Sequence, residues 1–124
     1  MAKTIMIVDD SVTMLMSLRN SLEIAGFLVL AAADGALALT QLKGGQRPDL
    51  IITDINMPNM GGIELIGKVR ALPGFRFIPI LALTTESGQV RRDEAKAMGA
   101  SGWLVKPVAS ADLVRIIKQV LPGA

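Results

Sequence analysis

Five short apolar runs recur along the chain, and each of them ends at polar or turn-forming residues. The runs cover 3–8, 27–32, 50–53, 77–83 and 102–105. Continuous apolar runs of this length indicate strands that are buried on both faces, as in a parallel sheet. Between the runs, apolar residues recur three or four positions apart, which predicts helices over 12–25, 36–42, 63–72, 89–98 and 111–121.

Strands that alternate with helices predict a doubly wound α/β domain, a five-stranded parallel sheet covered by five helices on its two faces. The boundaries carry helix-capping residues: Asp10 or Ser11 before the first helix, Asp34 before the second and Ser110 before the last. The helix over 89–98 has a thin apolar face of Val90, Ala97 and Met98, so we expect it to be the least firmly anchored.

Composition narrows the chemistry that is open to this domain. The 124 residues suit one domain, residues 1–124, and 51% of them are apolar, enough for a core. The absence of cysteine and histidine excludes Cys/His zinc sites, thiolate nucleophiles and Ser-His-Asp catalysis. A net charge of +2 and four aromatic residues argue against nucleic acid as a partner. The longest apolar run, 27–33, is far too short to cross a membrane, and we expect a cytosolic protein without a membrane partner.

Polar residues stand where four of the predicted strands end: Asp9 and Asp10, Asp54, Thr84, and Lys106. In doubly wound sheets, ligands bind at the carboxyl ends of the strands. Neighbouring strands lie about 4.8 Å apart, so carboxylates that leave adjacent strands can share one cation. Oxygen ligands alone select a hard metal, and Mg²⁺ typically takes one or two carboxylates together with waters and phosphate oxygens.

A carboxylate beside a metal, a lysine and a hydroxyl is an arrangement that can form an aspartyl-phosphate. Asp54 is the best candidate for the nucleophile, because Asp9 and Asp10 stand together where a metal would be held. Each residue taken singly has an ordinary explanation, such as a helix cap for Asp10, a turn for Asp54 and solvated surface for Lys106. It is their joint spacing that favours a site.

Four segments in the same order resemble the receiver domain of two-component response regulators, and within that family the single-domain, CheY-like chemotaxis regulators. The matching segments are 7–11, 54–62, 83–86 and 99–107. The resemblance implies a flavodoxin-like sheet of strand order 2-1-3-4-5. It also implies that Asp54 accepts a phosphoryl group from a histidine kinase and that the output is a protein–protein interaction. The receiver would catalyse only this transfer onto itself and its own dephosphorylation.

The resemblance assigns further roles at the site. Asp9, Asp10, Asp54 and the backbone carbonyl of Asn56 would hold Mg²⁺, and the phosphoryl oxygens would contact two side chains, Thr84 and Lys106. Thr84 would also act with Trp103 as a conformational switch, and the phosphate lifetime would depend on Asn56 and Glu86. The bond between Lys106 and Pro107 would be cis. Thr85 departs from the small Ala or Gly frequent at its position, which leaves the dephosphorylation rate open.

The resemblance leaves several partners and roles open. One interpretation is a monomeric chemotaxis regulator that acts on the flagellar motor switch and has a phosphatase as a further partner. The alternatives are a phosphorelay shuttle, a phosphate sink and a fragment of a transcription factor. Basic residues near the helix over 89–98 suggest recognition of an acidic partner segment: Arg91, Arg92, Lys96, Arg115 and Lys118. A solvated charged face is the ordinary alternative.

Proteins of other classes fit the residues less well. A flavodoxin-like electron carrier needs a phosphate-binding loop after the first strand, where Asp9 and Asp10 would repel an FMN phosphate. A haloacid-dehalogenase-like phosphatase needs an acid two residues after its nucleophile, and position 56 is Asn. A degenerate receiver that acts only as a scaffold is disfavoured by the complete set of acidic, Thr and Lys residues.

Overall fold

The computed structural model describes residues 2–121 and 123, and strands alternate with helices throughout. The strands are β1 (Thr4–Val8), β2 (Leu28–Ala32), β3 (Leu50–Thr53), β4 (Ile80–Thr84) and β5 (Gly102–Val105). The helices are α1 (Val12–Ile24), α2 (Gly35–Lys43), α3 (Gly62–Ala71), α4 (Gln89–Met98) and α5 (Ser110–Val120). In the part of the chain that the structure describes, no helix is long and apolar enough to span a membrane.

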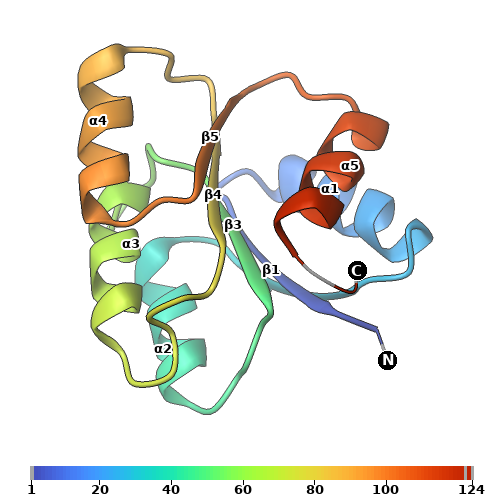
Figure 1. Ribbon diagram of the computed structural model, residues 1–124, viewed down its shortest axis with the longest axis horizontal. Coiled ribbons are helices and arrows are strands. Elements are labelled where there is room, and N and C mark those ends of the chain that lie inside the picture. Colours follow the sequence, from blue (N-terminus) through green and yellow to red (C-terminus); the bar gives the residue numbers. More distant parts are fainter. Residues whose placement is uncertain (1, 122, 124) are drawn as a thin grey trace.

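All five strands are parallel and lie in the order β2-β1-β3-β4-β5, which confirms the doubly wound α/β prediction. Helices α1 and α5 cover one face of the sheet, and α2, α3 and α4 cover the other (Figure 1). Val8 pairs with Thr53 across β1 and β3, so the residues that follow these two strands leave the sheet side by side.

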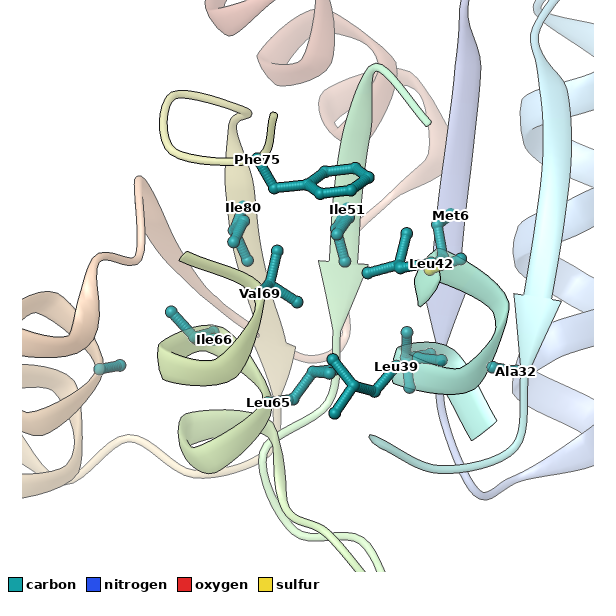
Figure 2. Packing of buried hydrophobic residues seen from close by; sticks show 13 residues of the cluster. Met6, Ala32, Leu39, Leu42, Ile51, Leu65, Ile66, Val69, Phe75 and Ile80 are labelled. Carbon is teal, nitrogen blue, oxygen red and sulfur yellow. The ribbon is translucent and has the colours of Figure 1, made fainter. Parts of the chain in front are cut away.

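The core consists of two apolar clusters, one on each face of the sheet. Successive strand residues point to opposite faces, so Ile5 and Ile7 of β1 contribute to the α1/α5 side while Met6 and Val8 contribute to the other. Figure 2 shows this second cluster, in which Leu39 and Leu42 of α2 and Leu65, Ile66 and Val69 of α3 pack over the sheet. Both faces of the central strands are therefore covered, as their unbroken apolar runs predict.

One predicted strand boundary and one predicted helix cap are wrong, whereas the other predicted ends lie within one residue of the observed ones. The fourth strand begins at Ile80 and not at Phe77, which is 88% exposed. The predicted strand included Pro79, which has no N–H to donate to a neighbouring strand. Ser110 does not cap the last helix, because it is the first helical residue and Ala109 takes the N-cap position. The Ser110 hydroxyl instead contacts the Ser21 hydroxyl at 2.9 Å. The first two caps are confirmed: Ser11 accepts from Met14 N–H and Asp34 accepts from Leu37 N–H.

Helix α4 buries only one residue, Ala95, so its weak apolar anchoring is confirmed. The residue identities were predicted wrongly, because Val90, Ala97 and Met98 are all exposed. The C-terminal end of α4 is held by α3 in another way. The Met98 methyl group occupies the space that a side chain at Gly67 would need, and the guanidinium of Arg70 donates two hydrogen bonds to the carbonyl of Gly99, at 2.7 and 3.1 Å.

Arg70 also donates to three carbonyls in the α3–β4 connection, those of Phe75, Arg76 and Ile78. Burial lowers the pKa of Arg70, yet the guanidinium stays charged because its ordinary pKa lies far above neutrality. We expect Arg70→Lys to cost about 2 kcal/mol in the free energy of unfolding, since an ammonium cannot reproduce this fan of bonds. Urea denaturation measures the loss. Arg19→Lys, in an exposed pair with Glu23, is the matched control and should change stability by less than about 0.5 kcal/mol.

Candidate functional site

The polar residues that end four strands lie at one edge of the sheet, as the sequence predicts. Asp9 directly follows β1, Asp54 follows β3, Thr84 is the last residue of β4, and Lys106 follows β5. The Lys106 ammonium joins residues far apart in the chain: its Nζ lies 2.8 Å from Oδ2 of Asp9 and 3.5 Å from Oδ2 of Asp54. The parallel topology therefore assembles a single charged cluster from separate segments.

Three carboxylates belong to this cluster. Asp9, Asp10 and Asp54 each offer one oxygen such that all three oxygens lie within 4.8 Å of one another. Asp9 is buried, Asp54 is partly buried and Asp10 is exposed. One ammonium contacts two of the three carboxylates, those of Asp9 and Asp54, so the cluster carries excess negative charge at short range. A hard cation that accepts oxygen ligands fits this site.

Lys106 remains protonated in this environment. Burial alone would lower the pKa of Lys106, but the hydrogen bond that Lys106 donates to Asp9 and the charge of Asp54 outweigh it, and the pKa is raised above its ordinary value. The side chain therefore supplies a permanent positive charge at neutral pH. An ammonium held between two carboxylates can also pair with the oxygens of an incoming anion.

Backbone N–H groups orient the carboxylates of Asp9 and Asp54. Ser11 N–H donates to Oδ1 of Asp9 at 2.9 Å, and Ile55 N–H donates to Oδ1 of Asp54 at 2.7 Å. In both cases the other oxygen, Oδ2, is the one that faces Lys106. Each carboxylate thus has one oxygen held by the backbone and one turned toward the charge cluster.

Gly62 is a site residue that sequence reasoning missed. A Cβ at this position would overlap the carbonyl oxygen of Asp54, so only glycine lets the first turn of α3 approach the β3 end so closely. Gly62 N–H also donates to the Ile55 carbonyl at 2.9 Å. The two successive glycines at the start of α3, Gly61 and Gly62, were the available signal.

Thr84 and Trp103 are connected through one residue, Glu86. The Thr84 side chain is fully buried, and its hydroxyl oxygen accepts a hydrogen bond from Glu86 N–H at 3.2 Å. The indole N–H of Trp103 donates to the carbonyl of the same residue, Glu86, at 2.9 Å. The structure therefore brings together the residues that the resemblance names as a switch. Asn56 is exposed in the β3–α3 connection.

A cleft of about 320 Å³ lies between α4 and β5, beside Trp103. Its walls carry both charged and polar side chains, among them Gln89, Arg92, Asp93 and Lys96. Of the five basic residues that the sequence places around α4, Arg92 and Lys96 line this concave surface together with Trp103, whereas Arg91, Arg115 and Lys118 do not.

Comparison with known proteins agrees with this geometry. The profile of the response regulator receiver domain matches residues 5–118. This chain belongs to that family. The receiver domain is 37% identical over 118 residues to the chemotaxis protein CheY1 of Helicobacter pylori strain J99, which covers 94% of this chain and 95% of that one. This chain is therefore a two-component response regulator.

Solved structures show the same fold. The Vibrio cholerae chemotaxis protein CheY4, crystallised at low pH, matches with a TM-score of 0.93 and 40% identity over 98% of this chain and 100% of that one. The receiver domain of the sensor histidine kinase PA1611 from Pseudomonas aeruginosa PAO1 has a magnesium ion coordinated in its active site cleft. It matches with a TM-score of 0.88 and 29% identity over 97% of this chain and 98% of that one.

The excess charge of the site makes a prediction about Asp10 in this receiver domain. Without Mg²⁺, Asp10→Asn is expected to raise the free energy of unfolding by about 0.5–1 kcal/mol, because it removes one of three mutually repelling carboxylates. Urea denaturation with a chelator measures the gain, and excess Mg²⁺ should stabilise the variant less than the wild type. Asp112→Asn makes the same charge change at an exposed pair with Arg115 and should show neither effect.

Proposed function

We propose that Asp54 is the phosphoacceptor of this response regulator. The observation that carries the proposal is the position of the Asp54 carboxylate: Oδ2 faces the Lys106 ammonium at 3.5 Å, within a group of three carboxylates whose oxygens lie within 4.8 Å. The β3 end and the first turn of α3 hold Asp54 from both sides, so a nucleophile is fixed beside positive charge.

The residues of the site fit Mg²⁺, because they offer only oxygen ligands and carry excess negative charge. Asp9, Asp10, Asp54 and the backbone carbonyl of Asn56 would hold the ion. The magnesium ion in the active site cleft of the PA1611 receiver domain supports this assignment. When bound, Mg²⁺ supplies positive charge that offsets the charge of the phosphoryl oxygens during transfer.

The phosphoryl group comes from a phosphohistidine of a kinase, since the chain has no histidine. An Asp54 carboxylate oxygen forms a bond to phosphorus, while the P–N bond breaks and its electron pair leaves with the imidazole of the donor. Lys106 pairs with the phosphoryl oxygens, and the Thr84 hydroxyl donates to one of them. Both groups already lie at the edge of the sheet that carries Asp54.

Phosphorylation is coupled to the output surface through Glu86. When the Thr84 hydroxyl turns toward the phosphoryl group, it no longer accepts from Glu86 N–H, and the turn after β4 is released. The same residue accepts the indole N–H of Trp103, so the change reaches β5 and the cleft beside α4. Phosphorylation thereby shifts the equilibrium between two conformations of Thr84, Trp103 and α4, and a partner binds one of these conformations more tightly.

The lifetime of the phosphate is set by the side chains around its exposed side. Asn56 and Glu86 flank the site from the loops after β3 and β4, and Thr85 adds a methyl group in the second loop. Attack by water at phosphorus breaks the O–P bond and returns the Asp54 carboxylate. This reaction and the transfer onto Asp54 are the only catalysis in the proposal.

Chemotaxis is the role that the relatives support best, because the similar proteins of Helicobacter pylori and Vibrio cholerae are chemotaxis proteins. The proposed output is binding of a monomer to an acidic segment of a cytoplasmic partner such as the flagellar motor switch. Arg92 and Lys96 line the cleft beside α4, so the cleft offers two positive charges to an acidic segment.

Charge reversal tests the binding surface. Arg91→Glu together with Lys96→Glu is expected to weaken binding of the phosphorylated protein to its motor-switch target at least about tenfold, because attraction to an acidic segment becomes repulsion. Fluorescence anisotropy with the labelled target segment measures the change. The double variant Lys43→Glu with Lys68→Glu is the matched control, on the side of α3 away from α4. An equal loss of target affinity in the two double variants would contradict a specific binding surface.

Incubation with Mg²⁺ and phosphoramidate, followed by intact-mass measurement, tests the central proposal. We expect a gain of one phosphoryl group that requires Mg²⁺ and that borohydride reduction and peptide mapping place on Asp54. A protein that takes up no phosphoryl group, or one that takes it up on a hydroxyl side chain, would overturn the assignment.

A further inference from the structure

The turn between β2 and α2 lies directly against the loop between β3 and α3. The side-chain amide of Asn59 donates to Oδ2 of Asp34 at 2.8 Å, and the backbone N–H of Gly35 donates to the Met60 carbonyl at 3.2 Å. A Cβ at Gly35 would lie 2.7 Å from the same carbonyl oxygen, so the backbones can approach this closely only where residue 35 is glycine. The two loops come from segments 25 residues apart.

Both partners of the side-chain bond are held in defined conformations. Asp34 is buried, at 7% exposure, and its second oxygen, Oδ1, accepts Leu37 N–H at 2.8 Å as the cap of α2. Each carboxylate oxygen thus has its own donor. The Leu37 N–H and then the Asn59 amide lower the pKa of Asp34, so the carboxylate is charged at neutral pH. Asn59 has φ of 66°, a left-handed conformation that asparagine adopts more readily than most residues.

The loop that Asn59 anchors carries Asn56, whose carbonyl belongs to the proposed magnesium site. On one side of Asn56, Ile55 is fixed by its bonds to the Asp54 carboxylate and to Gly62 N–H. On the other side, the Met57 side chain packs against the core, and the first hydrogen bonds to a different element are those of Asn59 and Met60. Within residues 2–121 and 123, no hydrogen bond holds Asn56 itself. Its carbonyl is therefore placed by the anchors on its two sides.

We infer that Asp34 and Asn59 form a clasp that positions the Asn56 carbonyl for the metal, and that they are positioning residues for phosphorylation. This inference rests on the proposed function. The clasp fixes one side of the metal-binding loop to α2, whereas Gly62 and Ile55 fix the other side to α3 and β3. Loss of the clasp leaves the three carboxylates and the Gly35–Met60 backbone bond in place but loosens the loop that carries the fourth ligand, which lowers magnesium affinity without removing the nucleophile.

Two substitutions remove the clasp and leave local structure intact. Asp34→Ser keeps a side-chain oxygen that can cap α2 through Leu37 N–H, but a single hydroxyl cannot also reach Asn59. Asn59→Gly keeps the left-handed backbone and removes the amide. Asp49→Ser is the matched control, because Asp49 also accepts a backbone N–H, from Thr4 at 2.8 Å, near the start of β1. Thermal unfolding verifies that every variant is folded.

Calorimetric titration with Mg²⁺ and ¹⁵N NMR spectra of the metal-free protein test the clasp. Each single variant is expected to bind Mg²⁺ about tenfold more weakly than wild type, as for other outer partners of metal ligands. The double variant should bind no more weakly than either single one, since both remove the same contact. In the metal-free spectra, the Asn59 side-chain amide signal should shift on Asp34→Ser and the Asn56 backbone signal should move in both variants.

Three results would overturn the clasp: Mg²⁺ affinities of the single variants within about twofold of wild type, losses that multiply in the double variant, or an equal loss in Asp49→Ser. Wild-type protein that binds Mg²⁺ and is phosphorylated, combined with unaffected variants, rejects the clasp alone. Wild-type protein that binds no Mg²⁺ rejects the proposed function, and the clasp with it.

Discussion

Replacement of Asp54 by asparagine is expected to abolish phosphorylation by phosphoramidate or by a histidine kinase. The amide has nearly the shape of the carboxylate and can still accept Ile55 N–H through Oδ1, so the β3 end keeps its structure. It lacks the negative oxygen that must form the bond to phosphorus. Intact-mass measurement should show a single unmodified species under conditions where wild type gains one phosphoryl group.

The Asp54→Asn protein should fold at least as well as wild type, because it loses one of three repelling carboxylates. Urea denaturation verifies this point and separates lost chemistry from lost structure. Asp49→Asn, which also removes a carboxylate that accepts a backbone N–H, should be phosphorylated like wild type. A phosphoryl group that still appears on Asp54→Asn at the wild-type rate would place the acceptor elsewhere.

Replacement of Lys106 by methionine should cause the second large effect, a loss of both stability and phosphotransfer. Asp9 is 2% exposed, and its ammonium partner at 2.8 Å would be gone. Breaking a buried pair costs about 3–5 kcal/mol, and the partial exposure of the lysine reduces this to about 2–3 kcal/mol in the absence of Mg²⁺. Phosphorylation should slow by at least about a hundredfold, since the phosphoryl oxygens lose their ammonium.

Magnesium distinguishes the two roles of Lys106. Excess Mg²⁺ should restore most of the lost stability, because a divalent cation can neutralise Asp9, but it should not restore the rate of phosphotransfer. Urea denaturation with and without Mg²⁺, together with initial rates of mass gain, measures both. Lys68→Met, in an exposed pair with Glu64, is the control. A Lys106→Met protein that is phosphorylated as fast as wild type would contradict the proposed role.

The ends of four strands could be predicted from sequence because each is marked by a change from apolar to polar or charged residues. Asp9, Asp54 and Lys106 therefore lie where the pattern places them, at one edge of a parallel sheet. The strand order could not be derived from the pattern and came from the family resemblance. Ser110 shows the limit of local signals, because its hydroxyl contacts Ser21 of α1 instead of capping its own helix.

Contacts between distant segments were invisible to sequence reasoning. Nothing local to Asp34 or Asn59 indicates that they bond across 25 positions, and the same is true of Arg70 and Gly99. The anchoring of α4 by Ala95, with Met98 over Gly67, likewise depends on how α3 and α4 are placed over the sheet. Periodicity predicts which faces are apolar, whereas these bonds depend on the final approach of two chain segments.

The way α4 is held determines how it can move. Its C-terminal end is fixed to α3 through Gly99 and Met98, whereas its first turn has no side-chain cap and follows directly on the turn that Glu86 connects to Thr84. The helix is thus anchored at its Met98 end and is held more weakly at its Gln89 end. A displacement at Glu86 would therefore move Arg91 and Arg92 more than Lys96, which lies nearer to Met98.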